Sequence, residues 1–250
     1  MTATQLPRVD FVAIGAQKAG TTALFEYLKD DHRLNLSNVK EVHFFDDETL
    51  DWLAPDYGLY HARFNMDRPG LKGEATPIYI FWPDSLERLR AYNPSVRLIL
   101  MLRDPVERAY SHWRMEYARG IEKYPFAWAI REGRARVAQA LPKHANHRVF
   151  TYVERGFYGA QVRRLFTLFP RDQVLIERAD ALKTDPTLVL ARVCIHLGLS
   201  QPVAAAVPRT VHAAREMDYG PAITPGEQAY LRDLYAEDQA LLETLTGIRL

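Results

Sequence analysis

The chain has 250 residues, with 32 Lys and Arg against 31 Asp and Glu, so its formal net charge is +1. This length suffices for one large α/β domain with a full core, and no Pro-, Gly- or Ser-rich linker divides it. We therefore expect a single domain over residues 1–250. The near-balance of charge argues against a general nucleic-acid binder, since such proteins carry a strongly basic surface.

Cysteine use and hydropathy bear on the cellular compartment. The single cysteine, Cys194, cannot form an internal disulfide, and its apolar surroundings in the sequence favour a small core residue over a nucleophile. The first ten residues do not resemble a secretory signal, and no apolar run approaches the ~20 residues of a membrane span. These features predict a cytoplasmic protein with no membrane span and no nucleic-acid partner, and they leave its oligomeric state open.

The first predicted unit is a strand, a turn and a helix within residues 11–28. A short apolar run leads into a turn bounded by Gly15 and Gly20, and an amphipathic pattern follows. Glycine permits backbone dihedrals and close approaches that a Cβ would hinder. The spacing of the two glycines fits a phosphate-binding loop, but the lysine lies two residues before the second glycine, which differs from the Walker A pattern.

The side chains of this turn point to an anionic ligand. Successive backbone N–H groups and a helix N-terminus favour negative charge. Lys18 would add a positive charge, and the hydroxyls of Thr21 and Thr22 would donate to phosphate oxygens while capping the helix. An ordinary strand, turn and helix with a chance lysine is the alternative.

The next candidate site is the segment from Lys40 to Asp46. If it is extended, Glu41 and His43 point to the same face, because the side-chain period of a strand is two. That arrangement would place a carboxylate beside an imidazole. A surface edge strand with a solvated ion pair remains the alternative.

Residues 50–92 contain a second carboxylate candidate. The aromatic-rich segment 50–64 predicts short helical turns that cover the site, and residues 71–77 predict a short strand that runs into a turn before Pro77. Glu74 lies near the end of this strand, and Tyr79 follows the turn. A helix is expected from Pro83 to residue 92.

Residues 96–102 form the clearest buried strand, because their nearly continuous apolar run is typical of a central parallel strand. Arg103 stands at the carboxyl end of this strand, the edge at which open α/β sheets bind ligands. A helix follows, and Ser111 lies about two turns into it. A guanidinium and a hydroxyl could therefore converge on a further anion, although a structural arginine and a solvated serine are the alternative.

The remaining elements complete an α/β fold. Helices are predicted at residues 125–141, 158–169, 186–197 and 225–245, a fourth strand is predicted at 173–177, and residues 201–224 are expected to be irregular. The alternation of strands and helices predicts a single domain with a central parallel β-sheet flanked by helices.

Five separated motifs together resemble a known family. They lie at residues 15–22 (GAQKAGTT), 40–46 (KEVHFFD), 74–77 (EATP), 102–111 (LRDPVERAYS) and 156–158 (GFY). Their order resembles the PAPS-dependent sulfotransferases, most closely the branch that includes the heparan sulfate sulfotransferases and bacterial relatives. The resemblance spans roughly residues 11–247 and implies a P-loop-like sulfotransferase fold.

The resemblance also implies a site for the donor, 3′-phosphoadenosine 5′-phosphosulfate (PAPS), and for its product, adenosine 3′,5′-bisphosphate (PAP). In the family the first loop holds the 5′-phosphosulfate, and an arginine and a serine hold the 3′-phosphate. The donor-site residues expected here are Gln17, Lys18, Ala19, Gly20, Thr21, Thr22, Arg103, Ser111, Tyr158 and Arg215. No metal is expected, because fixed cations and amides would already meet the phosphates.

The same resemblance implies catalytic roles. Lys18 would stabilise charge on the departing bridging oxygen, and Glu41 matches the glutamate that serves as base in the heparan sulfate branch. His43 either orients Glu41 or is the base itself. Glu74 is a third candidate for the base, and Glu41, His43, Glu74 and Tyr79 form the expected acceptor site.

The chain departs from the family in two places. Ala75 replaces a lysine that assists in some members, and Lys72 or Lys40 could substitute for it. The late loop that closes over the nucleotide is poorly matched, which leaves His212, Arg215 and Tyr219 as candidates.

The function expected from these observations is sulfuryl transfer from PAPS to a hydroxyl, with an amine as the alternative. The acceptor could be a glycan, a lipid, a phenol or another small molecule. Two other functions stay open: a nucleotide kinase with a related loop, and a nucleotide-binding module without catalysis. The lysine position and Arg103 in place of a magnesium-binding acid disfavour the kinase.

Overall fold

A computed structural model describes residues 8–141, 143–200, 219 and 222–250. Its contacts divide the chain into two compact units. The first contains Met1–Ala16, Gly20–Leu102 and Thr167–Arg209, and the second contains Gln17–Ala19, Arg103–Phe166 and Thr210–Leu250. The assignment of the whole chain to a single domain stays a prediction.

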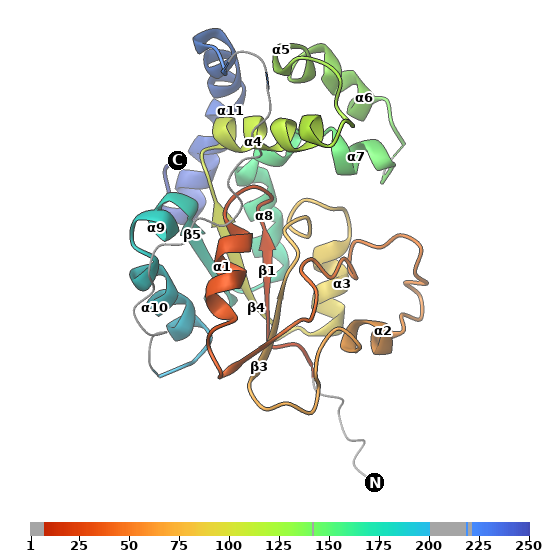
Figure 1. The fold of residues 1–250 in the computed structure, drawn as a ribbon, viewed down its shortest axis with the longest axis vertical. Coiled ribbons are helices and arrows are strands. Elements are labelled where there is room, and N and C mark those ends of the chain that lie inside the picture. Colours follow the sequence, from red (N-terminus) through yellow and green to blue (C-terminus); the bar gives the residue numbers. More distant parts are fainter. Residues whose placement is uncertain (1–7, 142, 201–218, 220–221) are drawn as a thin grey trace. The chain divides into compact units, whose positions relative to one another are not determined.

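The first unit is built on a five-stranded sheet in the order β2-β3-β1-β4-β5 (Figure 1). The strands are β1 (Phe11–Gly15), β2 (Leu34–Leu36), β3 (Leu71–Ala75), β4 (Arg97–Leu102) and β5 (Val174–Arg178). Every pairing in this sheet is parallel, which confirms the predicted α/β fold. β1 and β4 are almost entirely buried, as their apolar sequences require.

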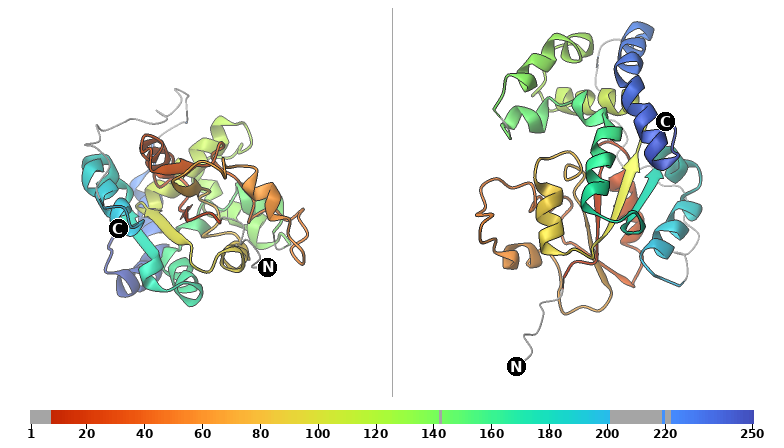
Figure 2. Two further views of the ribbon diagram at one scale, coloured as in Figure 1. Left: turned by 90° about the horizontal axis from the view of Figure 1, so that it is seen from below. Right: turned by 180° about the vertical axis from the view of Figure 1, so that it is seen from behind.

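Helices lie on both faces of this sheet. They are α1 (Thr21–Leu28), α2 (Tyr57–His61), α3 (Ser85–Tyr92), the 3-10 turn η3 (Arg171–Gln173), α9 (Ala179–Thr184) and α10 (Pro186–His196). The front and back views place α1 on one face and α3 on the other (Figure 2). Cys194 is buried in α10, in agreement with its prediction as a core residue.

The second unit is helical in its described part. Its elements are α4 (Pro105–Ala118), α5 (Phe126–Ala129), η1 (Glu132–Arg134), α6 (Ala135–Ala138), α7 (Ala145–Val149), η2 (Glu154–Gly156), α8 (Tyr158–Leu168) and α11 (Pro225–Thr246). Trp113 of α4 and Tyr235 of α11 belong to its buried core. The Tyr235 hydroxyl donates to the Val153 carbonyl at 2.8 Å. A Cβ on Gly156 would lie 2.5 Å from that hydroxyl oxygen, so only glycine fits there.

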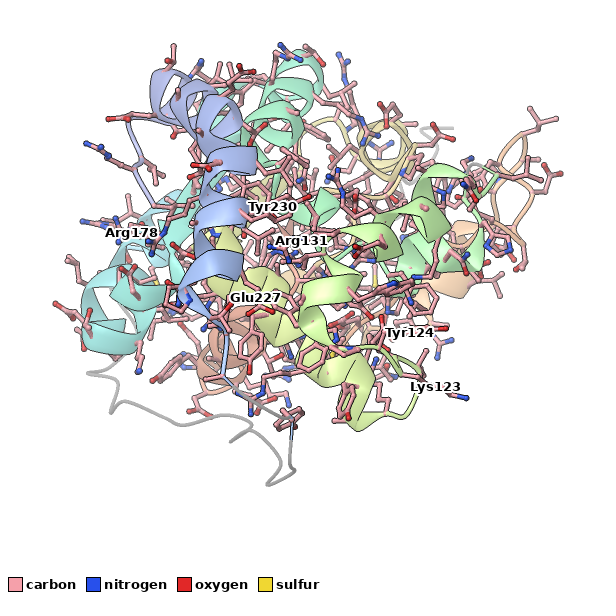
Figure 3. The ribbon with its side chains drawn as sticks, turned by 90° about the horizontal axis from the view of Figure 1, so that it is seen from above. Lys123, Tyr124, Arg131, Arg178, Glu227 and Tyr230 are labelled. Atoms are coloured by element: carbon pink, nitrogen blue, oxygen red, sulfur yellow. The ribbon has the colours of Figure 1, made fainter. Side chains whose placement is uncertain are left out.

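Contacts at its surface also hold α11 in this unit. The guanidinium of Arg131, the residue before η1, lies 4.5 Å from the centre of the Tyr230 ring on α11, and Figure 3 labels both side chains. Such a cation–π contact is favourable at an exposed site by about 0.5–1 kcal/mol. Asp238 of α11 accepts from the backbone N–H groups of Gly159 and Ala160 at the start of α8, at 2.7 and 2.9 Å.

Hydropathy along the helices bears on membrane insertion. Within the described ranges, no helix combines the length and apolar character that crossing a membrane requires.

The structure corrects three expectations about local structure. Residues 40–46 form no strand, and the helix expected at 125–141 is divided into α5, η1 and α6. Neither Thr21 nor Thr22 caps α1, because the N-cap residue is Gly20, at φ 88°, and no described side chain caps that end. His212 and Arg215, named for the late loop and the donor site, lie outside the described residues.

Candidate functional site

The first loop depends on its two glycines for different reasons. A Cβ on Gly15 would lie 2.4 Å from Cγ2 of Ile80, so any side chain at this position would clash with the turn after β3. Gly20 has φ 88°, a left-handed conformation that favours glycine. Thr21 is 3% exposed and Thr22 half-buried at the start of α1. Because no described side chain caps this end, the first N–H groups of α1 can meet an anion.

Lys18 lies in the middle of the loop with φ 70°, which is uncommon for a residue with a side chain. Its Nζ lies 3.7 Å from Sδ of Met115 on α4. The preceding side chain, Gln17, accepts a hydrogen bond from Arg155. Arg155 is 2% exposed and also donates to the Thr151 hydroxyl and to two backbone carbonyls, so it is rigidly held. Gln17 and Lys18 thus contact other residues of the second unit, to which they belong.

A cavity of about 820 Å³ lies in the second unit, and three predicted donor-site residues line it: Lys18, Arg103 and Ser111. Its cationic lining residues are Lys18, Arg103, Arg114, Arg119 and Arg232, against the carboxylates of Asp104 and Glu107. This excess of positive side chains favours an anionic ligand.

One face of α4 supplies much of the cavity wall. Residues 107, 111, 114 and 118 recur at intervals of three or four, so they share one side of the helix. Asp104 caps α4 by accepting from the N–H of Glu107 at 2.9 Å. The Glu107 carboxylate in turn accepts from Arg103 Nη2 at 2.9 Å, and both side chains are partly exposed. Arg103 is therefore held at the cavity by a carboxylate that a bound anion could displace.

Six predicted donor-site residues that the structure describes do not line this cavity: Gln17, Ala19, Gly20, Thr21, Thr22 and Tyr158. Ala19 is 0% exposed and Tyr158 is 1% exposed. Burial raises the pKa of the Tyr158 hydroxyl to about 12, so it stays neutral at ordinary pH. Their contact with the donor stays a prediction, as does that of Gln17, whose side chain is held by Arg155.

The first unit contains the predicted carboxylate and imidazole. Nε2 of His43 lies 3.3 Å from Oε2 of Glu41, and Nδ1 of His43 lies 3.0 Å from Oδ2 of Asp46. Nζ of Lys40 lies 3.1 Å from the other oxygen of Glu41. The expected juxtaposition is thus present, but His43 at φ 56° produces it through a turn and not through a strand.

These contacts set the charges of the two side chains. Burial opposes the charged form of His43, but the hydrogen bonds to Asp46 and Glu41 outweigh it and raise its pKa to about 9. Burial likewise opposes ionisation of Glu41, but the hydrogen bond to His43 and the charge of Lys40 give a net lowering of its pKa. At neutral pH His43 is an imidazolium and Glu41 is a carboxylate.

Glu74 is placed differently from Glu41. It is 1% exposed at the end of β3, and its two oxygens accept from the hydroxyls of Tyr60, at 3.1 Å, and Thr76, at 2.5 Å. Burial raises its pKa to about 7 despite these hydrogen bonds. Tyr79, which was predicted with Glu41, His43 and Glu74 to contact the acceptor, is 0% exposed. Direct contact of either residue with an acceptor stays a prediction that their burial does not support.

Several residues with clear roles in this geometry were not expected from the sequence. Asp46, fully buried beside His43, and the Thr76 hydroxyl lie within two of the five motifs, but no role was predicted for them. Arg155 and Arg232 carry no local signal, because they come from parts of the chain far from the predicted motifs, whereas the spacing of Arg114 from Ser111 on α4 could have indicated Arg114. Only the three-dimensional structure brings these side chains to the sites.

Comparisons with known proteins agree with this geometry. The family model described as "Sulfotransferase domain" matches residues 8–212. Human heparan sulfate glucosamine 3-O-sulfotransferase 6 is 30% identical over 199 residues, which cover 76% of this chain and 52% of that protein. A sulfotransferase from Alicyclobacillus acidocaldarius, known from its crystal structure, is 27% identical in sequence. The match covers 98% of each chain and has a TM-score of 0.80.

A more distant structure shares the fold. Mouse sulfotransferase SULT7A1, solved in complex with PAP, is 14% identical with a TM-score of 0.54, and the match covers 96% of this chain and 89% of that one. The chain spans about half or less of the length of the curated relatives it matches, with coverage of 26%, 52% and 23% for three of them.

Proposed function

The chain belongs to the sulfotransferase domain family, and from this premise we propose that it transfers a sulfuryl group from PAPS to a hydroxyl group and releases PAP. The observation that carries the proposal is the cavity lined by Lys18, Arg103 and Ser111. Its volume of about 820 Å³ is that of a small-molecule site. Five cationic side chains in its wall suit a ligand with several negative charges.

The residues of the first loop and of α4 have separate roles in holding the donor. Arg103 and Ser111 would hold the 3′-phosphate through charge-assisted hydrogen bonds. The N–H groups at the start of α1, with Thr21 and Thr22, would hold the 5′-phosphosulfate. Lys18 would donate to the bridging oxygen, on which negative charge grows as the bond to sulfur breaks.

Glu41 is the base in this proposal. A base needs a free lone pair, and His43 lacks one at neutral pH because its pKa is raised to about 9 by Asp46 and Glu41 against the effect of burial. The ionised Glu41 takes the proton of the acceptor hydroxyl. At the same time the oxygen of that hydroxyl bonds to sulfur, and the bond between sulfur and PAP breaks. His43 keeps the Glu41 carboxylate in place and remains protonated.

The acceptor is assigned by class only. The human relative is named for a glucosamine of heparan sulfate, so a glycan hydroxyl is one candidate. Phenols, lipids and small metabolites are the others, since the aromatic-rich region 50–82 suits a ring or an apolar surface. A cytoplasmic location, the absence of a nucleic-acid partner and a reaction without metal also belong to the proposal, and they rest on the sequence.

The first experiment is a calorimetric titration with PAP in the presence of a metal chelator. We expect the wild type to bind PAP, and Arg103→Ala to bind it about 10- to 100-fold more weakly, because a hydrogen bond to a charged group contributes about 1.5–3 kcal/mol. Arg163→Ala is the control, since Arg163 is an exposed arginine of α8 outside the cavity wall. Tight, magnesium-dependent ATP binding without PAP binding would support a nucleotide kinase instead.

A second experiment separates an enzyme from a binding module. Wild type and Lys18→Ala are incubated with PAPS and a panel of phenols, lipids and glycans, and sulfated products are detected by mass spectrometry. Turnover by the wild type that Lys18→Ala loses, while its unfolding temperature is retained, supports the assigned chemistry. PAP binding without turnover of any acceptor would favour a non-catalytic module.

A further inference from the structure

A buried carboxylate and three hydroxyls lie beneath the turn that carries Glu41 and His43. Glu74 accepts hydrogen bonds from Tyr60 and Thr76, and Tyr79 also stabilises the Glu74 carboxylate by hydrogen bonding. All four side chains are buried, with exposures between 0% and 1%. A carboxylate in such a place must be satisfied by donors, because an unpartnered buried charge is costly.

Two of these hydroxyls also bind the backbone of the turn. The Thr76 hydroxyl oxygen accepts from the N–H of Val42 at 2.9 Å, and the N–H of His43 lies 3.5 Å away. The Tyr79 hydroxyl oxygen accepts from the N–H of Phe44 at 3.0 Å. Residues 40–44 form neither helix nor strand, so regular secondary structure does not fix this backbone. Side-chain hydroxyls take that part instead.

The direction of every hydrogen bond in this network follows from Glu74. In its ionised form, which predominates above its pKa of about 7, the Glu74 carboxylate only accepts, so each hydroxyl bonded to it points its hydrogen toward it. The oxygens of Thr76 and Tyr79 are then left to accept from the backbone N–H groups. A valine at position 76 would have the same shape as threonine but could do neither.

On the basis of the proposed function, we propose that Thr76 and Tyr79, oriented by Glu74, are positioning residues that hold Glu41 and His43 in place for proton removal from the acceptor. Small displacements of a reacting group lower turnover strongly, because transfer requires near-attack geometry. Thr76 lies two residues after Glu74, and Tyr79 lies five residues after it. The end of β3 and the turn after it therefore supply all three of these side chains. The segment EATP of the sequence thereby acquires a role that does not involve a lysine at position 75.

The test compares Thr76→Val, which removes the hydroxyl, with Thr76→Ser, which keeps it. The primary measurement is the NMR titration of the His43 imidazole, which needs no known acceptor. We expect the pKa of His43 to fall in Thr76→Val from about 9 toward the ordinary 6.5, because the turn no longer holds the imidazole between its carboxylates. Thr76→Ser should keep the wild-type titration, and Tyr79→Phe should resemble Thr76→Val.

Turnover and donor binding complete the test. With an acceptor from the panel, kcat of Thr76→Val should fall at least about tenfold, while its PAP affinity stays within about twofold of wild type, because Thr76 does not line the donor cavity. An unchanged His43 titration in Thr76→Val, or an equal loss in Thr76→Ser, would overturn the proposal. Failure of the wild type to bind PAP would instead overturn the proposed function, and the NMR comparison would still report on the network.

Discussion

His43 carries its charge because it lies between two carboxylates. Asp46 has a fully buried side chain, 3.0 Å from Nδ1, whereas Glu41 lies 3.3 Å from Nε2 and is partly exposed. Burial lowers the pKa of His43, but these two partners raise it to about 9. The imidazolium is therefore the resting form across the physiological range, and it is suited to hold Glu41 and not to accept a proton.

Replacement of Asp46 by Asn should expose this dependence. We expect the pKa of His43 to fall toward 6.5 in Asp46→Asn, because one of its two negative partners is gone. The NMR titration of the imidazole measures this directly, and Asp51→Asn, at an exposed site in the same loop region, is the control. If His43 titrates identically in Asp46→Asn and the wild type, Asp46 does not set its charge.

The same shift affects stability with a defined sign. Because the pKa of His43 is higher in the folded than in the unfolded chain, its contribution to stability is fully present below pH 6.5 and is lost as the pH rises through about 9. In Asp46→Asn this loss should occur at lower pH. Urea unfolding of the wild type and of Asp46→Asn between pH 6 and pH 10 would measure the pH at which each loses this stability.

Glu74 differs from His43 in that its charged form is the one that the folded protein disfavours. Burial raises its pKa from 4.5 to about 7, so the folded protein binds this proton more tightly, and the associated stability is lost as the pH rises through about 7. The loss between pH 5 and pH 8.5 corresponds to about 2–3 kcal/mol. A carboxylate that costs stability when ionised fits a role in orienting the hydroxyls of Thr76 and Tyr79.

The variant Glu74→Gln should separate these two effects. The free energy of unfolding of the wild type falls by about 2–3 kcal/mol from pH 5 to pH 8.5 as Glu74 ionises, whereas that of Glu74→Gln should lack this loss, because the amide does not titrate. The stability of the variant relative to the wild type should therefore rise by this amount over the same pH range. Its turnover should nevertheless fall, since an amide nitrogen cannot accept from a hydroxyl. Glu87→Gln, on the exposed side of α3, is the control. Parallel pH profiles for Glu74→Gln and wild type would contradict the raised pKa.

At the scale of elements, strongly patterned segments were predictable. The apolar run at 96–102 and the periodic segments at 158–169 and 186–197 became β4, α8 and α10 with small changes at their ends. Their burial follows from their own sequences, which explains why propensity and periodicity sufficed. The three-residue strand β2 was missed because it is too short to show a period.

The segment 40–46 does not have the extended geometry on which its interpretation was conditional, although the predicted neighbours Glu41 and His43 do lie together. Its backbone N–H groups bond to the hydroxyls of Thr76 and Tyr79, more than thirty residues away in sequence, instead of to a neighbouring strand. Likewise, the N-cap of α1 is Gly20 and not a threonine, because the loop needs a left-handed residue there. Such long-range and conformational requirements leave no trace in local periodicity.

The first turn of α4 places an acid next to the arginine of the donor cavity. Since Glu107 holds Arg103 at 2.9 Å, a bound phosphate must compete with it. We expect Glu107→Gln to bind PAP about two- to fivefold more tightly, because an exposed ion pair contributes about 0.2–1 kcal/mol. Calorimetry measures the change, with Glu132→Gln as a control outside the cavity wall. Weaker binding would show that Glu107 orients Arg103 toward the phosphate instead of competing for it.

Over the whole molecule, charge is nearly balanced, at +1, yet the donor cavity collects five cationic side chains against two carboxylates. The attraction for PAP should therefore be local. Exposed and partly exposed charges are screened by salt, because the Debye length falls from about 10 Å at 0.1 M to about 3 Å at 1 M. A protein with no general basic surface should still show a salt-dependent affinity for this one ligand.

We expect the affinity for PAP to fall severalfold between 50 mM and 500 mM KCl, with a linear dependence of log Kd on log salt concentration. Arg232→Gln, which removes a cationic side chain of the cavity wall, should weaken binding and also reduce this slope. Arg163→Gln changes the net charge equally from outside the wall and should leave both unchanged. If the two variants instead reduced the slope equally, the overall charge of the molecule, and not the cavity, would attract the ligand.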